Sequence, residues 1–541
     1  MTNFSFHNRK QITENLKSTH FDLIIIGGGI TGAGILLDAS NRGLKCCLIE
    51  KGDFASGTSS RSTKLIHGGL RYLKQLDFKL VAEVGKERKI VSVIANHLTY
   101  PERVLLPFTK NGSLKKWSTR LALHLYEFLS KVEKKDQFKI LNKAEVLKFL
   151  PNLDENNLLG GADYVEYRTN DARLTLEVLK TAVPKNAFAL NYCEVERFSK
   201  KERQINGVYV YDLIADEKFL IQGKCVVNAT GPWVDKVREI NNSQTEKKLL
   251  HTKGVHLVFD KSNFPLSQAI YFDTPDKRMV FAIPRGKKVY IGTTDTIYSE
   301  NLDHPDITIK DKNYILDAIN FLFKDINLKL EHIESGWSGI RPLINQKGKT
   351  PSEISRKDEV FEDESGLISI AGGKLTGYRK MSEKIVDLVC NRLNITKKCT
   401  TNTLLISGAV KDGLSGFQVF LEEKTPSLVA LGLTKEVAIK LIRRYGKNID
   451  KVIALFEEKE FQVSELPLEI YLSLNYSLKY EMVITLQDFF IRRTNALYFN
   501  ISLVKNHKIE VANFMQRFFN WTGEEKSIQL EELEEAIKEV V

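Results

Sequence analysis

Hydrophobic positions are grouped differently in three parts of the chain. Near the N-terminus, residues 23–26 and 46–49 are short continuous apolar runs, separated by glycines and a helical stretch. Such runs are typical of parallel strands that are buried on both faces. Between about 160 and 300 short strand-like runs dominate, and after about 400 the apolar spacing becomes helical. The pattern predicts a parallel α/β unit, an antiparallel sheet set against it, and a separate helical domain.

Helical spacing also occurs at residues 80–98, 115–131 and 434–446, where Thr434 and Gly446 are suitable first and last caps. The 115–131 stretch has lysines at both ends and one apolar stripe, which could lie in a membrane interface or be buried as a core helix. The stripe consists of Trp117, Leu121, Leu125, Phe128 and Leu129.

A glycine pattern connects the first two predicted strands. Gly27, Gly29 and Gly32 form G-x-G-x-x-G at the turn into a helix, and Glu50 ends the second strand. Glycines allow a tight turn and close approach of a pyrophosphate to the helix N-terminus, while the acid can accept the hydroxyls of an adenosine ribose. This unit predicts a dinucleotide site that suits NAD and FAD equally.

Two later glycine-containing turns favour the longer dinucleotide. One follows the strand at residues 225–227 and contains Thr230 and Gly231; the other joins residues 367–371 to a helix through Gly373 and Thr376. FAD has a ring at its far end, and a helix N-terminus there stabilises negative charge on the reduced ring. Two extra backbone cradles therefore favour FAD over NAD.

Composition limits the classes of partner. A chain of 541 residues is too long for one compact core, so several domains are expected. Its composition, 43% hydrophobic and 27% charged, is typical of a globular protein. The net charge of +11 favours a phosphorylated substrate, a lipid surface or nucleic acid, unless the surface is simply basic. The six cysteines lack metal-site spacing, which indicates no metal, no disulfide framework and a reducing compartment. With neither a signal peptide nor a spanning segment evident, we expect a cytosolic protein or one attached to a membrane face.

Two residues are candidates for chemistry. His67 precedes a pair of glycines, and an imidazole near its ordinary pKa can take a proton from an alcohol, although a structural hydrogen bond is the commoner role. Arg341 lies between a glycine-containing segment and Pro342 and suits a bidentate grip on an oxyanion, although a salt bridge is an equal alternative.

Six segments in this order resemble the FAD-dependent glycerol-3-phosphate dehydrogenase family: IGGGITGAG, TSSRSTKLIHGGLRYL, NATGPW, IGTTD, SGIRPL and AGGKLTGYRK. The resemblance runs from about residue 21 to the end. It implies a Rossmann-like FAD-binding domain with an antiparallel substrate sheet of the glycine/D-amino-acid oxidase type, plus an all-α C-terminal domain. We expect an extension at 1–20, the oxidoreductase region at 21–399 and the helical domain at 400–541. Within 21–399, FAD-binding segments are expected at about 21–160, 220–250 and 335–395, and the substrate sheet at about 160–220 and 250–335.

The resemblance also implies an activity. The family oxidises sn-glycerol 3-phosphate to dihydroxyacetone phosphate and passes electrons through FAD to membrane quinone, which implies peripheral attachment to the inner face of the cell membrane; a homodimer stays open. The implied FAD contacts are Gly27, Gly29, Gly32, Glu50, Thr58, Ser59, Lys64, Ile66, Thr230, Gly231, Gly373 and Thr376. The implied substrate contacts are Arg71, Tyr72, His256, Thr294, Arg341, Arg356 and Lys374. His67 is the implied base, with Arg341 or Lys374 stabilising the alkoxide.

Three alternatives remain. Family members that use oxygen have an insertion between the positions of Arg341 and Lys374, and the short spacing here favours the dehydrogenase. A related amine or amino-acid oxidase shares the glycine pattern but binds a carboxylate, which the basic residues near the motifs disfavour. The positive net charge would permit a tRNA-binding flavoprotein. The sequence has no basic tract with interleaved aromatic residues, however, so we expect no nucleic-acid partner.

Overall fold

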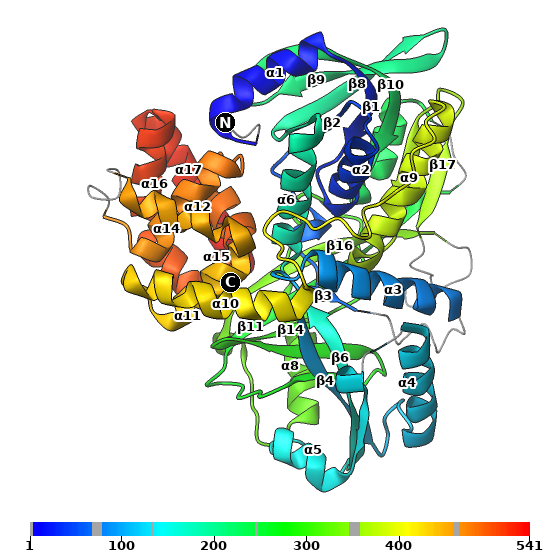
Figure 1. Cartoon of the computed structure of the whole chain (residues 1–541). Coiled ribbons are helices and arrows are strands. Elements are labelled where there is room, and N and C mark those ends of the chain that lie inside the picture. The colour runs from blue at the N-terminus through cyan, green and yellow to red at the C-terminus, as the bar shows by residue number, and fades with distance from the viewer. Residues whose placement is uncertain are drawn as a thin grey trace.

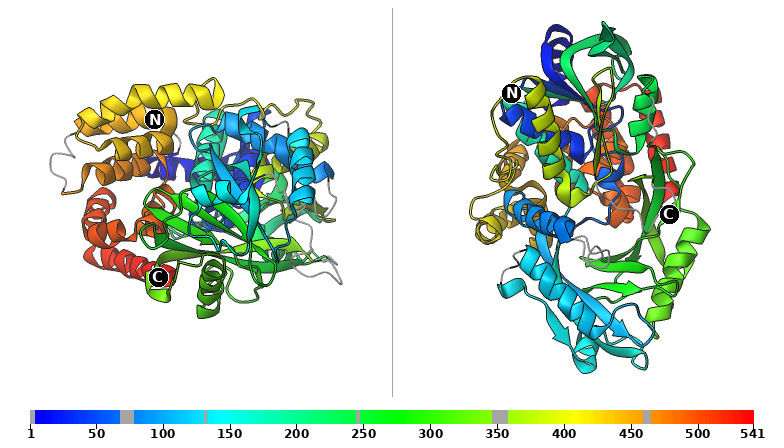
Figure 2. Two further views of the ribbon diagram at one scale, coloured as in Figure 1. Left: turned by 90° about the horizontal axis from the view of Figure 1, so that it is seen from below. Right: turned by 90° about the vertical axis from the view of Figure 1, so that its right-hand side faces the viewer.

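The fold consists of two β-sheets and a helical domain that lies along one side of both (Figures 1 and 2). The computed structural model describes residues 4–67, 78–130, 132, 134–243, 247–345, 358–458 and 465–541. This arrangement confirms the predicted fold class, an α/β nucleotide-binding unit with a substrate sheet and an all-α C-terminal domain.

The first sheet is built around the predicted glycine-rich unit and has the strand order β17-β18-β10-β1-β2-β7. Its central strands are parallel, with Ile25 opposite both Leu48 and Val227, and α2 packs against α6 and α9. A ribbon of β8 and β9 continues from β10. The strands are β1 (His20–Ile26), β2 (Cys46–Ile49), β7 (Ala187–Leu190), β8 (Cys193–Lys201), β9 (Gln204–Asp212), β10 (Glu217–Asn228), β17 (Glu359–Glu362) and β18 (Ile368–Ala371). The helices are α2 (Ile30–Asn41), α6 (Asp171–Ala182), α7 (Val234–Ile240) and α9 (Tyr378–Arg392).

The second sheet, in the lower half of Figure 1, is mostly antiparallel and has the order β15-β11-β14-β13-β12-β4-β6-β3, with β16 beside β11 and β5 beside β6. Its strands are β3 (Leu65–Ile66), β4 (Tyr100–Thr109), β5 (Lys139–Leu141), β6 (Leu158–Arg168), β11 (Leu249–Asp260), β12 (Ala269–Asp273), β13 (Met279–Arg285), β14 (Lys288–Gly292), β15 (Thr296–Ile297) and β16 (Ile333–Ile344). Helices α5 (Lys143–Phe149) and α8 (Ile309–Leu322) accompany it.

The strand pairing differs from the predicted division of residues 21–335. Strands β3 to β6, within 65–168, belong mainly to the substrate sheet, whereas β7 to β10, within 187–228, belong to the nucleotide sheet. The prediction assigned about 21–160 to FAD binding and about 160–220 to the substrate sheet. Apolar runs indicate where strands occur, but the partners of each strand are fixed by contacts between residues distant in the chain.

The first residues that the structure describes pack on the parallel strands. Helix α1 (Arg9–Ser18) packs on β7 and β10. Phe4, Ile12 and Leu16 are buried in the same core as the parallel strands, and Arg9 forms a buried ion pair of 2.6 Å with Asp212.

Helix α4 (Lys116–Ser130) lies beside α3 (Phe78–Ile94) and has apolar residues on two faces. Leu125 and Leu129 pack on Val81 and Tyr126. The other face presents large side chains to solvent, with Trp117 74%, Leu121 63% and Phe128 79% exposed. The single stripe predicted from the sequence is therefore divided between a packed and an exposed face. No helix in the described residues is long and apolar enough to cross a bilayer.

The caps predicted at Thr434 and Gly446 are present in the C-terminal domain. Thr434 accepts a hydrogen bond from the Val437 amide at the start of α11, which ends before Gly446. The helical pattern at 485–499 is divided into a π-helix, η11 (Asp488–Arg493), and α15 (Ala496–Phe499), with Asn495 in the left-handed conformation between them. The remaining helices are α10 (Gly413–Ala430), α11 (Lys435–Tyr445), α12 (Ile449–Ala454), α14 (Leu468–Tyr480), α16 (Ile501–Phe519) and α17 (Gly523–Val540).

Candidate functional site

A cavity of about 140 Å³ opens where the two sheets meet. Its walls come from the segment around β3, from β11 and β16, and from the turn between β18 and α9. They consist of Thr58, Arg61, Ser62, Thr63, Leu65, His67, Gly254, His256, Gly339, Arg341, Pro342, Leu343, Gly373, Lys374, Leu375 and Thr376.

The glycine turn after β1 has no room for side chains. Gly27 has φ of +110°, and a Cβ placed on it would lie 2.7 Å from the Ala229 carbonyl oxygen. A Cβ on Gly32 would lie 1.9 Å from the Gly27 carbonyl oxygen. Helix α2 begins after Gly29, which caps it without a side-chain hydrogen bond. The first turn of α2 can therefore present its N–H groups to a pyrophosphate.

Glu50 lies beside this turn and is held by two backbone donors. Its carboxylate accepts hydrogen bonds from the Gly28 amide at 2.6 Å and from the Gly52 amide at 2.8 Å. Partial burial raises the pKa of Glu50, although the two N–H groups oppose the shift. The carboxylate is fixed at the end of β2, where it fits the hydroxyls of an adenosine ribose.

Thr58 and Ser59 follow on a short 3₁₀ turn between the glycine turn and the substrate sheet. Ser59 Oγ accepts a hydrogen bond of 2.9 Å from the Ile30 amide in the first turn of α2. Thr58 Oγ1 donates to the Ile340 carbonyl at 2.7 Å. Ser59 is thus at the predicted pyrophosphate position, while Thr58 ties this segment to β16.

The other end of the cavity is formed by the turn from β18 into α9. Gly373 has φ of +83°, and a Cβ on it would lie 2.3 Å from Met381 Sδ. Thr376 Oγ1 donates to the His67 carbonyl at 3.2 Å, and α9 begins after Gly377 without a side-chain cap. At the third turn, Gly231 has φ of +57° and Thr230 Oγ1 donates to Asn228 Oδ1 at 2.7 Å. The starts of α2 and α9 follow two separate glycine turns, and this arrangement fits an extended dinucleotide whose ring lies at α9.

Arg341 enters the cavity from β16 and is oriented by the turn after β14. Its Nη1 donates to Asp295 Oδ1 at 2.9 Å and to the Thr294 carbonyl at 3.2 Å, and its Nη2 donates to Thr293 Oγ1 at 2.8 Å. A Cβ on Gly254 would lie 2.3 Å from Arg341 Nη2. The guanidinium is therefore fixed at the wall, with Asp295 balancing part of its charge.

His256 is buried and electrically neutral at physiological pH. Its ring stacks on Trp337 at 4.9 Å and its Nε2 lies 2.9 Å from Thr63 Oγ1. Burial, and then the positive charges of Arg341 and Lys64, lower the pKa of His256 well below its usual range. Nδ1 is buried without a hydrogen-bond partner among the described residues. A neutral imidazole with an open nitrogen suits a hydrogen bond to a hydroxyl group.

The sequence-predicted residues lie in different surroundings. His67, His256, Arg341, Lys374 and Thr376 all line the cavity, and buried Thr294 accepts a hydrogen bond from the Val255 amide beneath Arg341. Ile66 is buried in β3. The ammonium group of Lys64 is buried against Asp171 at 2.7 Å and the Ser60 carbonyl at 2.8 Å, and the contact of Lys64 with FAD stays a prediction. Arg71, Tyr72 and Arg356 lie outside the described residues.

Three supporting residues were missed. Thr63 and Trp337 hold His256, and Asp295 holds Arg341. Asp295 directly follows Thr294 in the IGTTD segment. Its position beside a predicted substrate contact could therefore have identified it from the sequence. The stacking of Trp337 has no local signal, because it depends on the pairing of β16 with β11.

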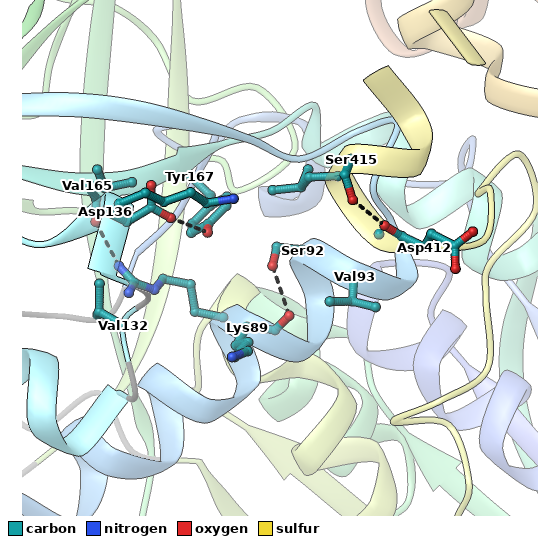
Figure 3. Close-up of a pocket in the computed structure, with 13 residues that line it drawn as sticks. Lys89, Ser92, Val93, Val132, Asp136, Val165, Tyr167, Asp412 and Ser415 are labelled. Atoms are coloured by element: carbon teal, nitrogen blue, oxygen red, sulfur yellow. Dashed lines mark hydrogen bonds between the residues drawn. The ribbon is translucent and has the colours of Figure 1, made fainter. Parts of the chain in front are cut away.

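A second cavity, of about 360 Å³, lies between α3, β6 and the start of α10 (Figure 3). Arg88 on its wall donates to the Val165 carbonyl and is paired with Glu166. Tyr167 also lines it and is opposite Ile66 of β3, so this cavity adjoins the strand that leads to His67. The described residues contain no group of three or more histidine, cysteine or acidic side chains placed to hold a metal ion.

Comparisons with known proteins agree with this geometry. The model of the FAD dependent oxidoreductase family matches residues 22–378, and that of the C-terminal domain of alpha-glycerophosphate oxidase matches residues 399–526. The chain is 49% identical to the aerobic glycerol-3-phosphate dehydrogenase of Staphylococcus epidermidis, covering 98% of this chain and 97% of that protein. It is also 49% identical to the Staphylococcus aureus enzyme of that name, covering 99% and 97%. The crystal structure of glycerol-3-phosphate dehydrogenase from Bacillus halodurans complexed with FAD superposes with a TM-score of 0.87 at 44% identity, covering 99% of this chain and 98% of that chain.

Proposed function

Because the chain belongs to the family of FAD-dependent glycerol-3-phosphate dehydrogenases, we propose that its cavity oxidises sn-glycerol 3-phosphate to dihydroxyacetone phosphate. When bound, FAD supplies the acceptor for a hydride from the substrate's C2. The observation that carries the proposal is the convergence of Arg341, Lys374, His67 and His256 on one cavity, beside two glycine turns that fit a dinucleotide.

The phosphate group requires cations at the cavity wall. A phosphate dianion that leaves water is costly unless it is paired and hydrogen-bonded. Arg341 is held in a fixed orientation by Asp295 and Thr293, so its grip on an oxyanion requires little reordering. Lys374 lies at the turn into α9, and the two side chains together supply positive charge from opposite sheets.

The hydroxyl proton requires a base. We assign this role to His67, which lies beside the α9 turn through the hydrogen bond from Thr376 to its carbonyl. The pKa of His256 is depressed by burial and by neighbouring positive charges, and in this proposal its neutral ring hydrogen-bonds a substrate hydroxyl. Arg341 or Lys374 stabilises the developing alkoxide.

Anaerobic mixing tests the reaction directly. The FAD-loaded protein is mixed with glycerol 3-phosphate without oxygen while the visible flavin band is followed. We expect rapid bleaching with glycerol 3-phosphate and none with glycine or D-alanine. A flavin that stays oxidised with glycerol 3-phosphate, or a protein that stays colourless after reconstitution, contradicts the proposal.

The electron acceptor in this proposal is a membrane quinone, reached from the inner face of the cell membrane. Support comes from the exposed face of α4, where Trp117, Leu121 and Phe128 project from a helix that also carries Lys116 and Arg120. Apolar side chains flanked by cations fit the interface of an anionic bilayer.

Co-sedimentation with vesicles of anionic lipid tests this surface. Phe128→Glu should reduce binding strongly, because it removes an aromatic side chain and adds a repelled charge. Phe321→Glu, at an exposed phenylalanine of α8, is the matched control and should bind as the unmodified protein does. Equal binding by both folded variants rules α4 out as the contact.

A further inference from the structure

The helical domain contacts the loop that follows Glu50 at one buried carboxylate, that of Asp53. Arg493 makes a two-pronged contact with Asp53, with Nη1 2.6 Å from Oδ2 and Nη2 2.9 Å from Oδ1. Arg492 Nε donates to the same carboxylate. Burial alone would raise the pKa of Asp53, but the Arg493 and Arg492 guanidinium groups lower it below its usual range. The carboxylate is therefore charged, and the helical domain supplies its positive partners.

Asp53 belongs to the loop that supports the glycine turn. The Ala55 amide donates to the Gly28 carbonyl at 3.1 Å. A Cβ on Gly28 would lie 2.8 Å from both Glu50 Cβ and Phe54 Cδ1. The 50–55 loop is thus in direct contact with the turn that would carry the pyrophosphate, and a shift of this loop moves Glu50 relative to Gly28.

A second connection reaches the same loop from the π-helix. Tyr192 donates its hydroxyl to Asp488 at 2.6 Å and its amide to the Gly52 carbonyl at 2.9 Å. Asn191 Nδ2 donates to Asp53 Oδ1 at 3.2 Å and to the Met482 carbonyl at 3.0 Å. The 50–55 loop is therefore connected to both 482 and 488–493 by buried polar contacts, and a small displacement of the helical domain would leave these buried groups without partners at a cost in free energy.

The connecting segment also has unusual backbone geometry. Residues 488–493 form a π-helix, a rare conformation that is frequent at functional sites. Arg493 additionally donates to the Glu481 carbonyl at 2.6 Å, so its guanidinium is fixed from both sides. Both arginines point from this turn to one carboxylate, which gives the segment a specific role at the 50–55 loop.

We infer that Arg492 and Arg493 are positioning residues for FAD, which hold the 50–55 loop so that Glu50 and the glycine turn fit the adenosine end of the dinucleotide. The inference rests on the proposed use of FAD and assigns a role to the C-terminal domain. Binding of FAD and docking of the helical domain are then coupled, and each strengthens the other by the same factor.

Titration of the FAD-free full-length protein with FAD, followed by flavin fluorescence, tests the inference. Arg493→Met should weaken FAD binding roughly 5- to 150-fold, the usual range for coupled sites. Arg493→Lys should be intermediate, because lysine keeps the charge but loses the two-pronged geometry. Asn96→Ala is the control, since it breaks the buried contacts of 2.8 and 3.2 Å between Asn96 and Val410 of the helical domain, which involve neither Glu481 nor Asp53.

The outcomes separate the inference from the proposed function. Equal loss of FAD affinity in Arg493→Met and Asn96→Ala indicates general destabilisation and overturns the inference, as does unchanged affinity in Arg493→Met. Hydrogen exchange of the unmodified protein gives a second test that needs no variant. Peptides covering 488–499 should become better protected when FAD binds, and unchanged protection overturns the inference. Failure of the unmodified protein to bind FAD contradicts the proposed function instead.

Discussion

Arg341 is oriented by the protein itself, because the turn at residues 293–295 supplies three acceptors for its guanidinium group. Such fixed geometry is valuable in catalysis, since displacement of a reacting or binding group by about 1 Å can reduce the rate about 100-fold. This position of the Arg341 side chain requires a glycine at residue 254, because any larger residue would fill the space that the guanidinium group occupies.

Gly254→Ala tests the requirement for this space. The added methyl group would overlap Arg341 Nη2, so we expect kcat/KM for glycerol 3-phosphate to fall by about 10- to 100-fold. Gly523→Ala, where a Cβ meets no atom within 4 Å, should leave the kinetics unchanged. An unchanged kcat/KM in Gly254→Ala would show that the position of Arg341 is not critical.

The role of His67 is tested by removing its side chain. His67→Ala should slow anaerobic flavin reduction by about 100- to 10,000-fold, the usual contribution of a general base. His304→Ala, at an exposed histidine that pairs with Glu539, is the control and should reduce its flavin at the normal rate. Stopped-flow absorbance near pH 7 measures both. Near-normal reduction in His67→Ala would assign the proton to another group.

Helix α4 shows how far local pattern predicts an element. Its position and its apolar stripe are evident from the sequence, because a 3.6-residue period is a local property. Its division into two faces is not, because Leu125 and Leu129 become buried only by packing on Val81 and Tyr126. The same limit applies to β7 to β10, whose existence follows from apolar runs but whose sheet depends on distant partners. Motif residues such as Gly27, Glu50 and Arg341 could be proposed for the site from the sequence, whereas Trp337 and Asp53, which contact residues of the site or its supporting loop, carry no local signal.

Paired substitutions on α4 distinguish the two faces. Leu125→Glu should lower the free energy of unfolding by about 1–3 kcal/mol, because it places a charge among packed side chains. Leu121→Glu on the exposed face should change it by less than about 0.5 kcal/mol. Urea unfolding followed by circular dichroism measures both. Similar losses in the two variants would mean that the exposed face also packs.

At the scale of the whole molecule, the three parts are held together by buried polar contacts as well as by apolar packing. Asn96 Nδ2 donates to the Val410 carbonyl at 2.8 Å, and the Val410 amide donates back to Asn96 at 3.2 Å. His97 is next to this contact and is crowded by the helical domain, since a Cβ on Gly408 would lie 2.7 Å from its Nε2. Burial, and then Arg173 and Lys180, lower the pKa of His97 well below its usual range.

The two buried histidines, His97 and His256, make the stability of the folded protein depend on pH. Their pKa values are lowered in the folded state, so below about pH 6.5 the unfolded chain binds more protons and the free energy of unfolding falls. Each histidine should contribute up to about 1.4 kcal/mol per pH unit in that range and nothing above it. Urea unfolding between about pH 7 and about pH 5 measures the slope. His97→Gln should remove the share of one histidine, and an identical slope in the variant would show that His97 gains its proton in the folded state as readily as in the unfolded chain.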